Sequence, residues 1–171
     1  MSSTENNLTK ETLFLEAYQA HNDAIFRYCL FQTSNREKAI DITQDTFTKT
    51  WEYIAMGNTV DNIRAFLYKT AKNLIIDGRR KKKTASLDDL LDDGFDTPFD
   101  DREIHMARLD GEKAIELLDE LGDTYRECLT LRYVEDLSIS EIAETLGESE
   151  NTVSVRIHRG LEKLKEKYNE K

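Results

Sequence analysis

Side chains that can read or hold nucleic acid gather in one short segment, residues 149–159. Amide, hydroxyl, imidazole and guanidinium groups recur there, and these groups pair with base edges or clamp phosphates. They suit recognition rather than the making or breaking of covalent bonds. If the segment is helical, its outward side carries Ser149, Asn151, Thr152, Ser154, Arg156, His158 and Arg159.

A helix-turn-helix pattern positions these side chains. Ser138 and Glu141 have the spacing of a capping box, which begins a helix, and Gly147 supplies the positive φ that ends it. Two short helices around such a turn are typical of DNA-binding domains, whose second helix enters the major groove. An ordinary helical hairpin with a solvated polar face is the alternative. The predicted buried residues are Ile139, Ile142, Ala143 and Leu146 in the first helix, and Val153, Ile157, Leu161 and Leu164 in the second.

An acidic stripe occurs earlier in the chain. Its members are spaced by three and four residues, so they line one face of a helix. A solvated surface is the ordinary interpretation, and a basic partner helix is the alternative. The stripe consists of Asp41, Gln44, Asp45, Thr48 and Glu52.

A basic run, residues 79–83, ends a third amphipathic pattern. Such a run is favourable at the negative pole of a helix dipole, which is a purely structural interpretation. Lys69, Lys72 and Asn73 precede it along the same predicted helix. The combined footprint favours a surface that follows a phosphate backbone.

The charge of the chain is unevenly distributed. The formal net charge of −10 argues against nucleic-acid binding on its face. However, residues 60–83 hold eight Lys/Arg against two Asp, whereas residues 84–104 hold seven Asp and one Glu against one Arg. Screening limits the reach of each charge to roughly 8–10 Å, so the distribution matters more than the sum. The acidic total therefore does not exclude DNA binding.

The elements that carry these groups are predicted to be helices throughout. Only one proline and seven glycines interrupt 171 residues, and apolar positions repeat with helical spacing. We expect an all-α protein with a first helix over residues 10–32, a second capped by Ser34, and a break at residues 57–59 before the third. The predicted domains are residues 8–83 and 105–171, joined by a flexible acidic linker at residues 84–104.

Catalysis is not indicated by any motif. His21, His105 and His158 lie in separate segments without metal-ligand spacing, and no P-loop, GxGxxG or GxSxG motif is present. We expect no cofactor and no metal. Cys29 and Cys128 fall within apolar patterns and are predicted to be buried free thiols, with a structural disulfide as the less favoured alternative. No segment has the length and apolarity of a membrane span or a signal peptide, so we expect a cytoplasmic protein.

Three motifs in order resemble the extracytoplasmic-function (ECF) family of bacterial RNA polymerase sigma factors. Residues 39–47 (AIDITQDTF), followed by Trp51, resemble the core-binding helix of that family. Residues 66–77 (FLYKTAKNLIID) with Arg79 and Arg80 resemble its promoter-melting helix. The helix-turn-helix, with residues 127–129 (ECL) before it and 156–161 (RIHRGL) after it, resembles the C-terminal domain. The resemblance covers residues 10–168 and implies sigma region 2 followed by sigma region 4.

The resemblance implies a role for each surface. Core polymerase would be bound by Asp41, Gln44, Asp45, Thr48 and Trp51, against the β′ coiled coil. Residues 56–62 would hold a base flipped from the melted −10 element, which would be bound by Asn58, Asp61, Asn62, Lys69, Lys72, Asn73, Arg79 and Arg80. The −35 element would be read by Ser149, Asn151, Thr152, Ser154, Arg156, His158 and Arg159.

The resemblance also implies the partners, and it has to be weighed against two rival interpretations. The partners are core RNA polymerase, through the β′ coiled coil and the β flap, promoter DNA, and an anti-sigma factor if one exists. The free protein is expected to be a monomer. A stand-alone helix-turn-helix regulator is the main alternative, and an anti-sigma or adaptor protein would explain the acidity but not two DNA-facing elements.

The chain departs from the family pattern within the recognition helix. Ser154 and Val155 stand where members often have Lys and Ser, and residues 160–162 (GLE) are less basic than usual. We therefore expect fewer phosphate contacts than in other members and weak binding to promoter DNA without core polymerase. The acidic linker would add to this weakness by competing for the basic faces.

Overall fold

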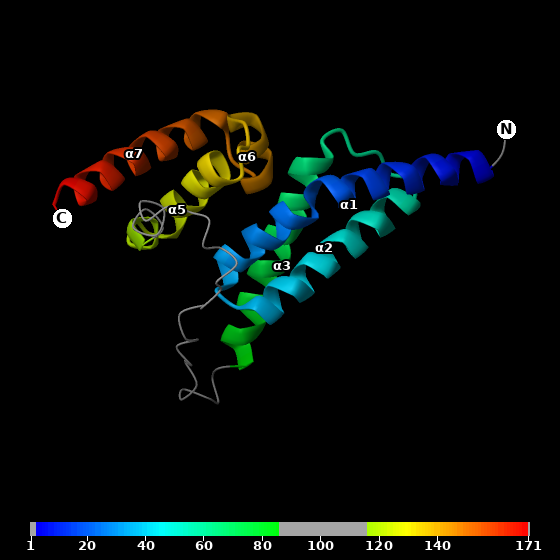
Figure 1. Ribbon diagram of the computed structural model, residues 1–171, viewed down its shortest axis with the longest axis horizontal. Coiled ribbons are helices and arrows are strands. Elements are labelled where there is room, and N and C mark those ends of the chain that lie inside the picture. Colours follow the sequence, from blue (N-terminus) through cyan, green and yellow to red (C-terminus); the bar gives the residue numbers. More distant parts are fainter. Residues whose placement is uncertain (1–2, 86–115, 171) are drawn as a thin grey trace. The chain divides into compact units, whose positions relative to one another are not determined.

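The computed structural model describes residues 3–85 and 116–170, and the regular structure in these two ranges is helical (Figure 1). The all-α prediction is confirmed. The chain divides into two compact units, one containing residues 3–85 and the other residues 116–170. The predicted acidic linker lies outside the described residues except for Thr84 and Ala85, which belong to a helix. Within the two described ranges, no helix combines the length and the apolarity needed to span a bilayer.

The first unit consists of three long helices packed against one another (Figure 1). They are α1 (Ser3–Thr33), α2 (Arg36–Ala55) and α3 (Ile63–Ala85). The core holds Ile25, Cys29 and Leu67, and the rings of Tyr28 and Tyr68 meet edge to face with centroids 5.3 Å apart. Burial of these large apolar side chains is the main force that holds the three helices together.

The turn between α1 and α2 corrects one prediction. Ser34 is not the cap of α2, because its backbone lies in the left-handed region with φ 50° and continues the end of α1 through a 2.8 Å bond from its N–H to the Leu30 carbonyl. Asn35 is the first extended residue, and its side chain accepts from the Lys38 N–H at 2.9 Å. Asparagine is a strong N-cap, so this site begins the helix.

The loop between α2 and α3 is closed by two asparagine side chains. Gly57 has φ 94° and ends α2, which confirms the predicted break. Asn58 donates from Nδ2 to the Tyr53 carbonyl at 3.0 Å. The Asn62 side chain accepts from the Ala65 N–H at 3.0 Å and thereby caps α3. These bonds fix where the loop leaves α2 and where it enters α3.

The second unit contains the predicted helix-turn-helix. After a helical turn at residues 116–119, α5 (Asp123–Leu129) runs into the π-helical segment η1 (Thr130–Val134), followed by α6 (Ile139–Leu146) and α7 (Glu150–Asn169). The capping box of α6, the left-handed Gly147 at its end and the Ser149 cap of α7 are all confirmed. Each is a hydrogen-bonding pattern within a few residues.

The inward face of α7 differs from the prediction at two positions, one of which is Leu164, because this residue is only half-buried. Val153 and Ile157 are buried as expected, but Leu161 is 38% exposed and Gly160 is buried instead. At about 100° per residue, Leu161 is turned about 80° away from Val153, whereas Gly160 stays on the buried side. A Cβ built on Gly160 would lie 3.1 Å from Leu129 Cδ1, so the glycine lets α5 approach α7 closely.

The first helix of the motif also has a mixed inward face. Ile142 and Ala143 are buried as predicted, whereas Ile139 and Leu146 are only half-buried. Thr145 is buried in their place, and its hydroxyl has no hydrogen-bond partner. Both cysteines are free and buried, as the apolar patterns around them indicated.

Candidate functional site

The acidic face of α2 is open to solvent. Asp41, Gln44, Asp45 and Thr48 are all exposed, and Glu52 continues the same row. Trp51 differs from the rest of the predicted polymerase-binding set, because it is half-buried and its ring lies 5.3 Å from that of Phe14. Trp51 therefore helps to hold α1 against α2, and the four polar residues form the accessible part of the set.

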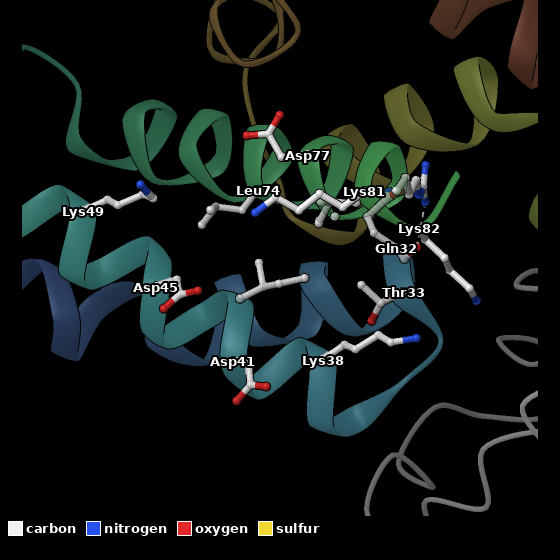
Figure 2. A pocket seen from close by; sticks show the side chains of 14 residues that line it. Gln32, Thr33, Lys38, Asp41, Asp45, Lys49, Leu74, Asp77, Lys81 and Lys82 are labelled. Atoms are coloured by element: carbon white, nitrogen blue, oxygen red, sulfur yellow. Dashed lines mark hydrogen bonds between the residues drawn. The ribbon is translucent and has the colours of Figure 1, made fainter. Parts of the chain in front are cut away.

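A groove of about 890 Å³ runs beside this face, between α2 and the C-terminal half of α3. Figure 2 shows Asp41, Asp45 and Lys49 along α2, Leu74 and Lys81 along α3, and the end of α1 at Gln32 and Thr33. The groove has mixed charge. Its acidic residues are Asp41, Asp45 and Asp77, and its basic residues are Lys38, Lys49, Arg79, Lys81 and Lys82.

Two lysines of this groove were missed by the sequence interpretation. Lys38 and Lys49 are both exposed and stand one helical turn before Asp41 and one turn after Asp45. Their spacing of three and four residues from the aspartates was the signal that places all four on one side of α2. The face is therefore an acidic centre flanked by positive charge.

The basic face of α3 gathers most of the residues predicted to bind DNA there. Lys69, Asn73 and Arg80 are exposed, and Lys72 is half-buried beside them. Their spacing keeps them within one side of the helix. Arg79 lies apart, because its Nη2 donates at 2.8 Å to the carbonyl of Gln32 at the end of α1. A guanidinium has five N–H donors, so this bond leaves others for a ligand.

The loop beside this face carries the other predicted residues. Asn58 and Asp61 are exposed, and Asn62 is half-buried with its amide oxygen engaged in capping α3. An aromatic pair that sequence reasoning missed adjoins them. The rings of Tyr53 and Phe66 lie 4.9 Å apart with an interplanar angle of 34°, and Tyr53 is partly open to solvent. No periodic signal predicted this pair, because its members come from two helices.

The residues predicted to bind the −35 element differ in exposure and in hydrogen bonding on the outward face of α7. Asn151, His158 and Arg159 are exposed, and His158 Nε2 lies 3.3 Å from a carboxylate oxygen of Glu162. Ser149 accepts from the Thr152 N–H at 3.1 Å, and the two hydroxyls lie 2.8 Å apart, so both serve the helix start. Ser154 is half-buried at the edge of the face.

Arg156, which is also predicted to bind the −35 element, forms an ion pair with Glu148. Its Nη2 donates to Glu148 Oε1 at 2.9 Å, and the side chains are 28% and 37% exposed. The pair links the turn before α7 to the helix itself, so Arg156 meets a phosphate only by sharing or leaving this carboxylate. In residues 3–85 and 116–170, no cluster of three His, Cys, Asp or Glu side chains is arranged to hold a metal ion.

Comparison with known proteins finds two families along the chain. Residues 17–85 match sigma-70 region 2, and residues 111–164 match sigma-70, region 4. The RNA polymerase sigma factor SigV of Bacillus subtilis (strain 168) is 30% identical over 162 residues, which are 92% of both chains. The ECF RNA polymerase sigma factor SigW of the same strain is also 30% identical, over 89% of this chain and 87% of its own.

Two solved structures share the fold. The sigma factor RpoE from Bartonella quintana, in complex with the anti-sigma factor NepR, superposes with a TM-score of 0.72 at 24% identity, covering 90% of this chain and 94% of its own. CnrH, in complex with the cytosolic domain of CnrY, gives 0.66 at 21% identity, covering 93% and 89%. Both sigma regions are matched in order, and SigV and SigW, each 30% identical to this chain, are covered over most of their length. The chain therefore belongs to the ECF family of RNA polymerase sigma factors, which direct promoter-specific initiation of transcription.

Proposed function

We propose that three surfaces of this sigma factor divide its work. The exposed polar face of α2 binds core RNA polymerase, the loop at residues 56–62 and the basic face of α3 bind the −10 element, and the outward face of α7 reads the −35 element. The observation that carries the proposal is the accessibility of these groups on two units that each have their own core. Each unit can then present its binding surfaces on a rigid scaffold, two surfaces on the first unit and one on the second.

Charge complementarity supports the polymerase contact. Asp41, Gln44, Asp45 and Thr48 offer carboxylate, amide and hydroxyl groups to a basic partner helix, for which the β′ coiled coil is our candidate. Such complementarity sets the orientation of docking more than its raw affinity. Lys38 and Lys49 flank the acidic centre, so they penalise a partner helix that slides one turn out of register.

Local chemistry supports the −10 contact. Lys69, Lys72, Asn73 and Arg80 follow one side of α3, so they can track the backbone of a DNA strand. Asn58 and Asp61 are exposed in the adjoining loop, where a base extruded from the stack would be held, and Asn58 keeps its amide oxygen for a ligand while its Nδ2 bonds to Tyr53. Holding it offsets an unstacking cost of a few kcal/mol. The exposed side of Tyr53 offers an aromatic surface beside that loop.

The geometry of α7 supports the −35 contact. Asn151 and Arg159 are exposed on the same side of the second helix of the motif, where a recognition helix contacts base edges. Asparagine pairs best with adenine and arginine with guanine in the major groove. The Ser149 cap orients the first turn of α7 and leaves the Asn151 side chain available.

The remaining partners follow from the same assignment. We propose that the protein acts in the cytoplasm as a monomer, without catalytic activity of its own, and that its second unit also contacts the β flap. Two proteins of the same fold are known in complex with NepR and with the cytosolic domain of CnrY. We therefore propose that an anti-sigma factor regulates this chain as well, by covering the α2 face or α7.

The test is transcription by bacterial core RNA polymerase from a library of random upstream sequences, with and without the protein. We expect protein-dependent transcripts whose templates share two spaced elements. D41K should abolish this activity together with core binding, whereas D23K, an equal change of charge at an exposed aspartate of α1, should not. N151A and R159A should alter only the upstream element. Normal core binding by D41K would refute the α2 assignment, and an unaltered upstream element would refute that of α7.

A further inference from the structure

Val155 is an apolar residue in the middle of a polar recognition face. It is 38% exposed, and it lies on the side of α7 opposite the buried Val153 and Ile157. Valine is a poorer helix former than alanine, because its branched side chain loses rotamer freedom in a helix. An exposed valine also adds little to a core. Folding of the unit therefore does not account for this residue at this position.

The neighbours of Val155 are the predicted base-reading groups. Asn151 stands one turn before it and Arg159 one turn after it, and both are exposed on the same side of the helix. Each of them can pair with hydrogen-bonding groups on base edges, whereas valine offers only methyl groups. The apolar group that a base edge presents in the major groove is the C5-methyl of thymine.

We propose that Val155 is a specificity-determining residue that contacts the methyl group of a thymine in the −35 element, an inference that rests on the docking of α7 proposed above. An α-helix rises about 1.5 Å per residue, so Asn151 and Arg159 each lie roughly 6 Å from Val155 along the axis. Base pairs are about 3.4 Å apart. The thymine therefore falls within about two base pairs of those that Asn151 and Arg159 read.

The expected size of the effect is that of one methyl group. Removing this contact should weaken binding about fourfold, which corresponds to the roughly 0.8 kcal/mol gained by burying one CH₂-sized group. Hydrogen bonding is unaffected when thymine is replaced by deoxyuridine, since only the C5-methyl is lost. The substitution thus isolates the proposed contact from every other feature of the base pair.

The experiment uses holoenzyme, assembled from core polymerase and the full chain, and the promoter selected in the transcription library. Each thymine of the −35 element is replaced singly by deoxyuridine, and the affinity of holoenzyme is measured. For wild type, we expect one position at which deoxyuridine binds about fourfold more weakly. V155S should bind the two bases equally well at that position.

Leu161 supplies the matched control. It lies on the same helix with the same 38% exposure, but about 120° around the axis from Val155, so L161S should keep the preference for thymine. Equal binding of thymine and deoxyuridine by wild type at every position, or an undiminished preference in V155S, would overturn the proposal. If N151A and R159A still shift the selected element in that case, α7 reads DNA without Val155. If they do not, the −35 assignment itself fails.

Discussion

Gly160 of α7 lies directly against the side chain of Leu129 at the end of α5. A Cβ built on Gly160 would be 3.1 Å from Leu129 Cδ1 and 3.3 Å from Cγ, and Leu129 is itself buried. The absence of a side chain at Gly160 thus sets how closely α7 packs on α5. The position of α7, the second helix of the helix-turn-helix, depends on this contact, although neither residue is part of the outward face of α7.

We predict that G160V destabilises the second unit by about 2 kcal/mol, because overpacking a core forces neighbouring side chains and backbone to shift. Gly78 provides the comparison, since it is also helical but has nothing within 4 Å of the place of its Cβ. G78A should stabilise the first unit by up to about 1 kcal/mol through helix propensity. Urea unfolding followed by circular dichroism, and by the fluorescence of the single tryptophan, Trp51, distinguishes the units. An unchanged transition in G160V would show that α5 and α7 separate without cost.

We predict that E148Q strengthens binding to promoter DNA several-fold at low salt. The change removes a negative charge from the recognition surface and releases Arg156, whose ion pair is exposed enough to be worth at most about 1 kcal/mol. The gain should shrink as salt rises, since both effects are screened. Fluorescence anisotropy of labelled promoter duplex with holoenzyme measures it. E166Q is the control, because Glu166 lies about 15 Å further along α7 than Arg156. Equal gains in both variants would indicate a general charge effect.

We predict that N62A destabilises the first unit by about 1 kcal/mol, because it removes the side-chain cap of α3. N62D should keep that stability, since aspartate caps as well as asparagine does. Transcription by the two variants then separates a structural role from a DNA contact. Loss of activity in N62D with normal unfolding, followed by Trp51 fluorescence, would assign Asn62 to the −10 element. Full activity in N62D would leave it a cap only.

We predict that T145V stabilises the second unit by about 1 kcal/mol. The Thr145 hydroxyl is buried without a hydrogen-bond partner, and such a group has lost its water without compensation. Thr50 is the matched control in the first unit, because it is equally buried but donates at 2.8 Å to the Thr46 carbonyl. T50V should therefore bring no gain. A fall in stability of T145V, measured by thermal denaturation, would contradict the prediction.

Much of the helix-turn-helix was predictable from the sequence, because its signals act over three or four residues. The Ser138–Glu141 capping box, the left-handed Gly147 and the Ser149 cap each depend on a hydrogen bond or a backbone angle within one turn. The same is true of the break at Gly57. Such local terms are present in the chain wherever it folds, so the pattern of residues was sufficient to place them.

The misplaced residues have a different cause. Ser34 and Asn35 are both acceptable caps, and the choice between them depended on how α1 ends at the Leu30 carbonyl. Leu161 looked like a core residue, but the side of α7 that packs against α5 holds Gly160, and Leu161 is turned away from it. In each case hydrophobicity or propensity gave two near-equal answers. The left-handed end of α1 decided the first, and the side of α7 that packs on α5 decided the second.

The sequence alone determined the helical class, the helix-turn-helix and the groups available for binding, because periodicity and capping are local properties. Only the tertiary structure decided how those groups are arranged in space. Arg79 reaches the Gln32 carbonyl across 47 residues of sequence, and the basic end of α3 faces the aspartates of α2 across one groove. These relationships arise where helices distant in sequence pack together, and their geometry is set by the shared core rather than by the spacing of residues along the chain.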